Sequence, residues 1–264
     1  MALQIPDSLA DFIDEVDSSG KTLLLHNRNR PEPMADLLSQ AFENQSVTVA
    51  EQHIPEGGED LVCLIDDGMV TEISPFRALE RSFLMINSDL YRTGANQSGV
   101  DDFPAVLTGL DEVEFTVRGF PQSNKEKLLL VLISRFIEYR ALESEAGGFH
   151  ATFQRLSRLD DEYGTQQIYK RLGESGVETH VYGIRDDPSV IEDIDVTVHE
   201  GLSTAYRRSW VVLFQPRDGN HTDNARDGPV ALVAVEIDNN VWRGLWTYDS
   251  DRVSRLQSHM TDAF

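Results

Sequence analysis

Apolar residues recur along the chain with two spacings, one typical of helices and the other typical of strands. Four of them share one helical face near the start and predict an opening amphipathic helix: Leu9, Phe12, Ile13 and Val16. Its cap is Asp7 or Ser8. Further helices are predicted over 34–42 and 74–84, and short stretches of β-favouring residues predict strands over 22–26, 47–49, 61–65 and 69–73.

Turn residues connect the last two of these strands. Asp66-Asp67-Gly68 predicts a tight hairpin, because glycine accepts a positive φ. Ser74 and Pro75 then predict the start of a helix, with the serine as its cap and the proline at its first position, where the missing N–H costs nothing.

The middle of the chain contains a segment of weak periodicity followed by the longest predicted helix. Residues 86–111 show little regular pattern, so we expect a loop and the main internal boundary there. Apolar and polar residues alternate over 113–117, as in a half-buried strand. A capping-box sequence at 123–126 starts the long helix, and Gly147-Gly148 ends it.

The last third is rich in predicted strands. β-branched and aromatic residues predict strands over 179–184, 196–198, 210–214, 230–237 and 241–248, and Asn239-Asn240 supplies a hairpin turn between the last two. One helix is predicted over 165–172, and a last one contains Val253, Leu256 and Met260 after Asp249 or Ser250 as cap.

These elements predict a mixed α/β (α+β) fold with largely antiparallel sheets and flanking helices. We expect an N-terminal α/β segment over 1–111 and a second domain over 112–264, or one continuous domain. The string Val-Thr-Val-x-Glu occurs at 47–51 and again at 196–200. It is either a chance recurrence or the trace of two related halves around the long central helix, with a ligand cleft between them.

The charge balance indicates a salty environment. Asp and Glu number 45 against 23 Lys and Arg, the net charge is −22, and only four of the cationic residues are lysines. Surfaces rich in carboxylates and poor in lysine are typical of proteins that work in molar salt, where a Debye length of about 3 Å screens their self-repulsion. We therefore expect a cytoplasmic protein from a salt-rich cell, and an acidic protein of a low-salt organism is the alternative.

Several classes of function find no support in the sequence. Lys and Arg do not cluster as direct nucleic-acid binding requires, and no apolar run is long enough to predict secretion or membrane insertion. The common phosphate-loop, nucleophile-elbow and zinc-protease motifs are absent. Cys63 is a lone cysteine in an apolar stretch, where a reactive thiolate is unfavourable. Since none of these signals is present, we expect no catalytic residue. No particular cofactor is indicated.

The histidines occur singly along the chain and do not predict a metal site. His180 and His199 lie on or beside predicted strands and are able to meet across a sheet. A structural role for this pair is favoured over metal binding.

Two groups of residues in the second half combine charged and aromatic side chains. Arg135 and Glu138 stand at i and i+3 in an apolar stretch of the long helix, where they either form an exposed ion pair or bracket a polar ligand. Gln154 belongs to the segment 149–155, which mixes aromatic and hydrogen-bonding groups without regular spacing, so ordinary packing is its alternative role.

A third group follows near the end of the chain. Glu236 ends an apolar strand and faces the aromatic segment that contains Trp246 and Asp249. Aromatic rings over a pocket bind flat ligands or cations. The alternative is a packed core in which Asp249 only caps the last helix.

These groups belong to a longer succession of short motifs. In order they are Ile133-Ser134-Arg135-Phe136-Ile137-Glu138, Phe153-Gln154-Arg155-Leu156-Ser157, Tyr169-Lys170-Arg171-Leu172, Val181-Tyr182-Gly183, Ser209-Trp210-Val211-Val212, Ala231-Leu232-Val233-Ala234-Val235-Glu236 and Gly244-Leu245-Trp246-Thr247-Tyr248-Asp249. The succession covers most of 120–260 and resembles the DICT sensory domain. That family occurs in diguanylate cyclases and two-component proteins, and as short stand-alone proteins in haloarchaea.

The resemblance implies a signal-receiving module that is not a catalyst and whose ligand is not established. Our leading hypothesis is a cytoplasmic sensor or adaptor that binds a small molecule or a partner protein. Because no kinase, cyclase or helix-turn-helix segment is visible, its response would pass to a separate transcription regulator or kinase. The alternatives are an enzyme with Glu138 or Glu236 as general base, and a pure interaction scaffold without a pocket.

Ligand sensing predicts that the candidate side chains converge on one cavity. Burying many polar groups beside aromatic rings is costly unless they bind a ligand or pair with one another. The candidate residues are Arg135, Glu138, Gln154, Trp210, Glu236, Trp246 and Asp249. In the alternative, the helical pair faces solvent and both tryptophans fill the core without an adjoining void.

The net charge of −22 predicts that folding depends on salt. Lowering the ionic strength to 0.01 M lengthens the Debye distance to about 30 Å, so carboxylates repel one another across the surface. The thermal midpoint should rise steeply from dilute buffer to molar KCl, as measured by circular dichroism. A midpoint that does not change with salt would show that the composition is not an adaptation to salt.

Overall fold

Helices and strands occur along the whole length of the chain, and the computed structural model describes residues 8–17, 20–27, 42, 45–53, 57–58, 60–87, 103–119, 127–160, 163–217 and 227–264. The strands are β1 (Lys21–His26), β2 (Val47–Gln52), β3 (Leu61–Asp66), β4 (Met69–Pro75), β5 (Phe115–Arg118), β6 (Gly147–Arg155), β7 (Val177–Ile184), β8 (Thr197–Glu200), β9 (Ser209–Pro216), β10 (Val230–Asp238) and β11 (Val241–Thr247). The α-helices are α1 (Leu9–Asp14), α3 (Phe76–Asn87), α4 (Ala105–Thr108), α5 (Lys127–Ser144), α6 (Tyr163–Gly173), α7 (Thr204–Arg208) and α8 (Ser250–Ala263). Two short 3-10 helices are η3 (Leu156–Leu159) and η4 (Pro188–Ile191).

Within these residues the strands form two sheets, which confirms the predicted mixed α/β fold. The smaller sheet has the order β2-β1-β3-β4, and the larger sheet has the order β5-β11-β10-β9-β6-β7-β8. β1 and β2 are parallel, and so are β6, β7 and β8. The other neighbouring strands pair antiparallel, so the expectation of largely antiparallel sheets is also confirmed.

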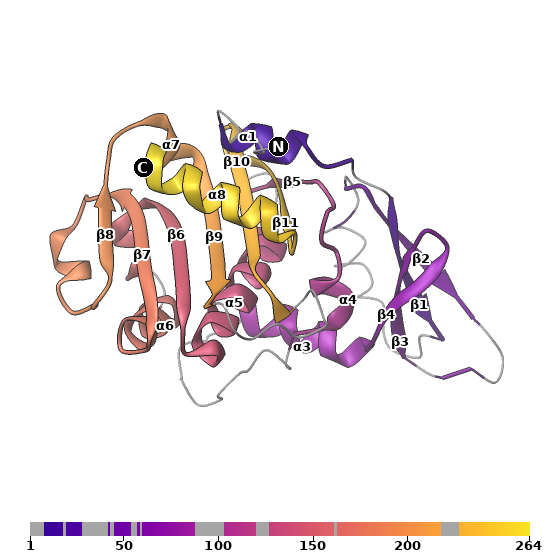
Figure 1. Cartoon of the computed structure of the whole chain (residues 1–264). Coiled ribbons are helices and arrows are strands. Elements are labelled where there is room, and N and C mark those ends of the chain that lie inside the picture. Colours follow the sequence, from indigo (N-terminus) through magenta and orange to yellow (C-terminus); the bar gives the residue numbers. More distant parts are fainter. Residues whose placement is uncertain are drawn as a thin grey trace.

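Helices cover both faces of the larger sheet (Figure 1). On one face, α5 packs on β9 and β10, and α6 packs on β7. On the opposite face α1 and α8 bury Phe12, Leu256 and Met260 against the strands. None of the described helices combines the length and the apolar character that crossing a membrane requires.

The two tight hairpins form where the sequence predicts them. Asp67 and Gly68 connect β3 to β4 with φ of 49° and 76°, and Asn240 connects β10 to β11 with φ of 56°. Glycine, asparagine and aspartate tolerate this left-handed conformation better than other residues do, which is why they mark the turns in the sequence.

The helix after β4 begins later than the sequence predicts. Ser74 and Pro75 still belong to β4, and α3 begins at Phe76. The Ser74 hydroxyl accepts a hydrogen bond from the Val106 N–H at 3.3 Å, so it connects β4 to α4. Pro75 is tolerated because it ends an edge strand, where a missing N–H removes no ladder bond.

Three predicted features lie wholly or partly outside the described residues. They are the helix over 34–42, apart from Phe42, the capping box at 123–126, and much of the loop within 86–111.

Lys21 connects the smaller sheet to the segment before β5. Its ammonium group, on a residue only 6% exposed, donates to the carbonyl oxygens of Gly109 at 3.0 Å and Asp111 at 2.8 Å. The carboxylate of Asp66 lies 3.6 Å away. Buried residues of both sheets belong to one hydrophobic cluster, so the core continues across the expected boundary near residue 111.

The repeated Val-Thr-Val-x-Glu string falls on two edge strands, β2 and β8. Each of them runs parallel to its neighbour, β1 or β7. The next strand differs, because β3 is antiparallel to β1 whereas β6 is parallel to β7. In the described part of the chain the two sheets therefore share an edge arrangement but not a strand order.

His150 points from β6 toward α8 and is buried in a stack of rings. Its Nδ1 lies 2.8 Å from the Tyr182 hydroxyl, its Nε2 lies 3.1 Å from Gln257 Nε2, and its ring stacks on His180 at 4.7 Å. The Nδ1 of His180 lies 2.9 Å from Nε2 of His199, so these two histidines meet across β7 and β8. Over the described residues, no three His, Cys, Asp or Glu side chains converge as metal ligands.

Acidification should destabilise the fold through His150. Burial, and next the positive charges of His180 and His199, lower the pKa of His150 from 6.5 to about 4. The unfolded chain therefore binds a proton here at a higher pH than the folded chain does, so the free energy of unfolding falls as the pH drops below the unfolded pKa. From about pH 7.5 to pH 5 the loss is about 2 kcal/mol, measurable by urea unfolding in molar KCl.

The control for this measurement is the exposed His53. His150→Gln should reduce the pH dependence because it removes one titrating ring, whereas His53→Gln should leave it unchanged. The same pH dependence in His150→Gln as in the natural protein would assign the effect to other groups.

Candidate functional site

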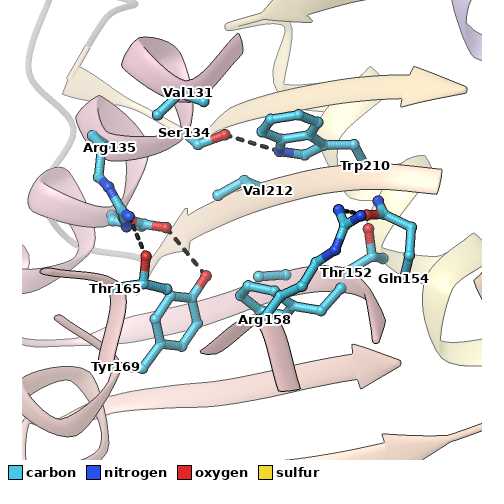
Figure 2. A pocket seen from close by; sticks show the side chains of 13 residues that line it. Val131, Ser134, Arg135, Thr152, Gln154, Arg158, Thr165, Tyr169, Trp210 and Val212 are labelled. Carbon is cyan, nitrogen blue, oxygen red and sulfur yellow. Dashed lines mark hydrogen bonds and ion pairs between the residues drawn. The ribbon is translucent and has the colours of Figure 1, made fainter. Parts of the chain in front are cut away.

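A cavity of about 340 Å³ lies above β6, between α5 and α6. It forms there because α5 packs mainly on β9 and β10 while α6 packs on β7, which leaves the space above β6 only partly covered. Its walls are Val131, Ser134, Arg135 and Glu138 of α5, Ala151, Thr152, Phe153 and Gln154 of β6, Arg158 of η3, Thr165 and Tyr169 of α6, and Trp210 and Val212 of β9. Figure 2 shows Arg135, Thr165 and Tyr169 on one side of this space, Thr152, Gln154 and Arg158 on the other, and Trp210 beside Ser134.

The floor of the cavity lies where the pairing of β6 with β9 ends. Their antiparallel ladder ends at Ala151 opposite Val212. Beyond this pair, the Thr152 hydroxyl accepts a hydrogen bond from the Val211 N–H at 2.8 Å, and Gln154 Nε2 donates to the Ser209 carbonyl at 2.7 Å. Two side chains of β6 thus satisfy backbone groups of β9 that a paired strand would otherwise satisfy.

A buried ion pair forms the wall on α5. The i, i+3 spacing places Arg135 and Glu138 on one helical face, and Nη1 of the arginine lies 2.6 Å from Oε2 of the glutamate. The two side chains are 7% and 4% exposed, so the alternative of a solvent-facing pair is wrong. Arg135 also donates to the Thr165 hydroxyl, and the Tyr169 hydroxyl donates to Glu138 Oε1 at 3.2 Å. The pair therefore ties α5 to α6.

Tyr169 is fully buried beside this pair. Burial, and next the negative charge of Glu138, raise the pKa of Tyr169 well above its usual value. The phenol therefore keeps its proton at any physiological pH and acts as a hydrogen-bond donor to the carboxylate.

Trp210 forms the wall on β9. Its indole N–H donates to the Ser134 hydroxyl at 3.1 Å, and that hydroxyl donates to the Leu130 carbonyl at 2.9 Å. The ring packs edge-on against Trp242, with ring centres 6.0 Å apart. The polar atom of the indole is thus bound within the protein, and its carbon surface contributes an apolar wall to the cavity.

The structure brings four of the seven predicted residues to this cavity, namely Arg135, Glu138, Gln154 and Trp210. The other three belong to different surroundings. Glu236 accepts a hydrogen bond from the Asn240 N–H and lies 3.6 Å from Arg208. Trp246 and Asp249 also lie outside the cavity lining.

Trp246 is fully buried in the hydrophobic core. It stacks on Phe115 with ring centres 4.9 Å apart, and its indole N–H donates to the Thr108 carbonyl at 3.3 Å. Asp249 caps α8, because its carboxylate accepts a hydrogen bond from the Arg252 N–H at 2.7 Å. Trp246 and Asp249 therefore follow the alternative interpretation of the sequence, in which the tryptophan packs in the core and the aspartate only caps the last helix.

Arg158, Thr165 and Tyr169 line the cavity although they were not among the candidate ligand-binding residues. Thr165 and Tyr169 stand at i and i+4 in α6, a spacing that places them on one helical face and that was available in the sequence. Arg158 lies in the short helix η3, and no periodic pattern marks a residue there.

Removing one member of the buried pair should be costly. Glu138→Gln leaves the guanidinium of Arg135 without its counter-charge, and breaking a buried pair in this way costs about 3–5 kcal/mol of unfolding free energy. The matched control is Glu200→Gln, because Glu200 and Arg185 also lie 2.6 Å apart but are 43% and 41% exposed. We expect about 0–1 kcal/mol for the control in urea unfolding at molar KCl. Equal losses would show that burial does not set the strength of the pair.

No protein-family model matches the chain, and no curated protein matches it either. Among solved structures, a crystal structure of polyphosphate kinase from Porphyromonas gingivalis aligns with a TM-score of 0.31 and 11% sequence identity. The alignment covers 96% of this chain and 47% of the other, so the chain spans about half the length of that structure. Similarity at this level assigns neither a shared fold nor a function.

Proposed function

We propose that this chain is a non-catalytic, cytoplasmic sensory module that binds a small molecule in the cavity above β6 and relays its presence to a separate output protein. The observation that carries the proposal is the lining of the cavity. Charged, hydroxyl and amide side chains converge there with an indole ring and valines around a volume of about 340 Å³. This volume lies within the range of roughly 300–1,000 Å³ typical of small-molecule pockets.

The polar groups in the walls support binding more than simple packing. Arg135, Glu138 and Thr152 are each at least 94% buried, and burying such groups costs free energy even when they are paired. An apolar filling of this space would serve stability better. A pure interaction scaffold gives no reason for a cavity of this kind.

The position of the cavity also supports a relay. Its walls come from α5, β6, η3, α6 and β9, so an occupant would fix the separation of α5 and α6. α5 also contacts α3, which directly follows β4 of the smaller sheet. The order of motifs that resembles the DICT domain runs through the same elements and adds to the case for a signalling role.

A second candidate is an enzyme that uses Glu138 as its base. One observation favours it, because the carboxylate contacts Arg135 and a second titratable group, Tyr169. Both oxygens of the carboxylate already accept hydrogen bonds from these two residues, so the carboxylate serves as a structural acceptor in the wall of the cavity. The sensory proposal is therefore the one we develop.

Recovery of a bound molecule tests the proposal. The natural protein, purified from a halophilic host in molar KCl, should release a defined small molecule on denaturation, identified by mass spectrometry. Val131→Trp should abolish this, because Val131 lines the cavity and the larger side chain fills it. The control Val70→Trp lies on the exposed part of β4 and should retain the molecule.

Three results would contradict the proposal. They are the absence of any enriched molecule with the natural protein, retention of the molecule by folded Val131→Trp, and chemical conversion of the molecule by the natural protein. The last result would favour the enzyme. Circular dichroism of both variants in molar KCl establishes that they are folded.

A further inference from the structure

The cavity reverses the charge balance of the rest of the chain. Of its charged lining residues, Arg135 and Arg158 are cationic and Glu138 is anionic. In the whole chain the acids outnumber Lys and Arg by 45 to 23. Since Arg135 and Glu138 neutralise each other at 2.6 Å, the net charge of the lining comes from Arg158.

Arg158 is held in place by a fixed partner but not by a carboxylate. Gln154 Nε2 donates to the Ser209 carbonyl, and this bond turns its Oε1 toward Arg158, which donates to it. Among the described residues no carboxylate forms an ion pair with Arg158. A guanidinium has five N–H donors, so most of them are available to a ligand that carries oxygen acceptors.

Thr152 adds a further donor on the same side of the cavity. Its oxygen already accepts the Val211 N–H, and in the described part of the chain its own O–H donates to no acceptor. Figure 2 shows Thr152, Gln154 and Arg158 together on one side, with Arg135, Thr165 and Tyr169 on the other. The Arg158 side thus offers a guanidinium and a hydroxyl donor next to each other.

Most of the lining between the two polar sides is apolar. Val131, Val212 and the carbon surface of Trp210 lie between the two polar sides. Such walls suit a flat ring, which an indole contacts favourably. A ligand that satisfies both parts of the cavity therefore carries an anionic group at one end and an apolar or aromatic body.

High salt makes direct contacts between the ligand and the cavity more important for recognition. In a molar-salt cytoplasm a Debye length of about 3 Å removes long-range attraction, so a charged ligand is recognised only by hydrogen bonds made at the site. Charge-assisted bonds to a guanidinium are of this kind and often bidentate.

We propose that the ligand is a small organic anion, a carboxylate or phosphate ester on a ring-shaped body, whose oxygens bind Arg158 and Thr152 while the ring packs against Trp210. This inference rests on the proposed function, because it names the class of molecule that the sensory cavity binds.

Matched pairs of probes test the charge of the ligand. Indole-3-acetate is compared with indole-3-acetamide, and adenosine 5′-monophosphate with adenosine, by calorimetric titration of the full chain in molar KCl. In at least one pair the anion should bind at least about tenfold more tightly than its neutral partner, which corresponds to about 1.4 kcal/mol. The pair that shows the preference distinguishes a carboxylate from a phosphate ligand.

Two arginine variants locate the effect. Arg158→Gln should remove the preference for the anion, and it should fold because Arg158 is exposed. The control Arg155→Gln should keep the preference, since Arg155 lies outside the cavity lining and is 63% exposed beside Asp186. A preference that survives in Arg158→Gln overturns the assignment.

Other results of the binding measurements would also overturn the inference that the ligand is an anion. Equal or tighter binding of both neutral partners overturns the inference, and so does the failure of both anions to bind with a Kd below about 1 mM. The proposed function is judged separately by the molecule recovered from the halophilic host. If that molecule is neutral or cationic, the binding function stands and the anion inference fails.

Discussion

β6 and β9 separate beyond the pair Ala151–Val212, and the geometry of the cavity floor depends on this separation. β6 has a parallel neighbour, β7, on one side and an antiparallel neighbour, β9, on the other, and the chain crosses from β6 to β7 through η3 and α6. Helices follow the strands that they connect, and here they pack on either side of β6. In α/β sheets, ligands commonly bind where the direction of chain connection changes in this way.

Two of the polar side chains in the cavity have a role in this separation, and two others connect the helices above it. Thr152 and Gln154 take over hydrogen bonds that an uninterrupted ladder would make. Arg135 and Glu138 of α5 are hydrogen-bonded to Thr165 and Tyr169 of α6. Buried ion pairs contribute little net stability compared with apolar side chains of the same size. Their position between two helices suits a site whose shape must be defined more than it suits a site that only fills space.

Local signals in the sequence predict the elements well and the site only in part. Turn residues such as Gly68 and Asn240 mark hairpins because their backbone angles are unusual, and that information is local. The charged pair on α5 is recognisable because two charges interrupt an apolar helix. Glu236 and Trp246 look equally suitable in sequence, but β10 and β11 lie beyond β9 in the sheet. The spatial order of strands depends on long-range pairing, which spacing along the chain does not contain.

Lys21 is one of the few lysines in the chain, and its burial gives it a role that the surface charges do not have. Ions in the solvent screen exposed carboxylates, but they have little access to an ammonium group enclosed by Gly109, Asp111 and Asp66. The connection between the smaller sheet and the segment before β5 therefore depends less on ionic strength than contacts between exposed charges do. The strength of this contact is set mainly by the groups of the protein that surround the ammonium group.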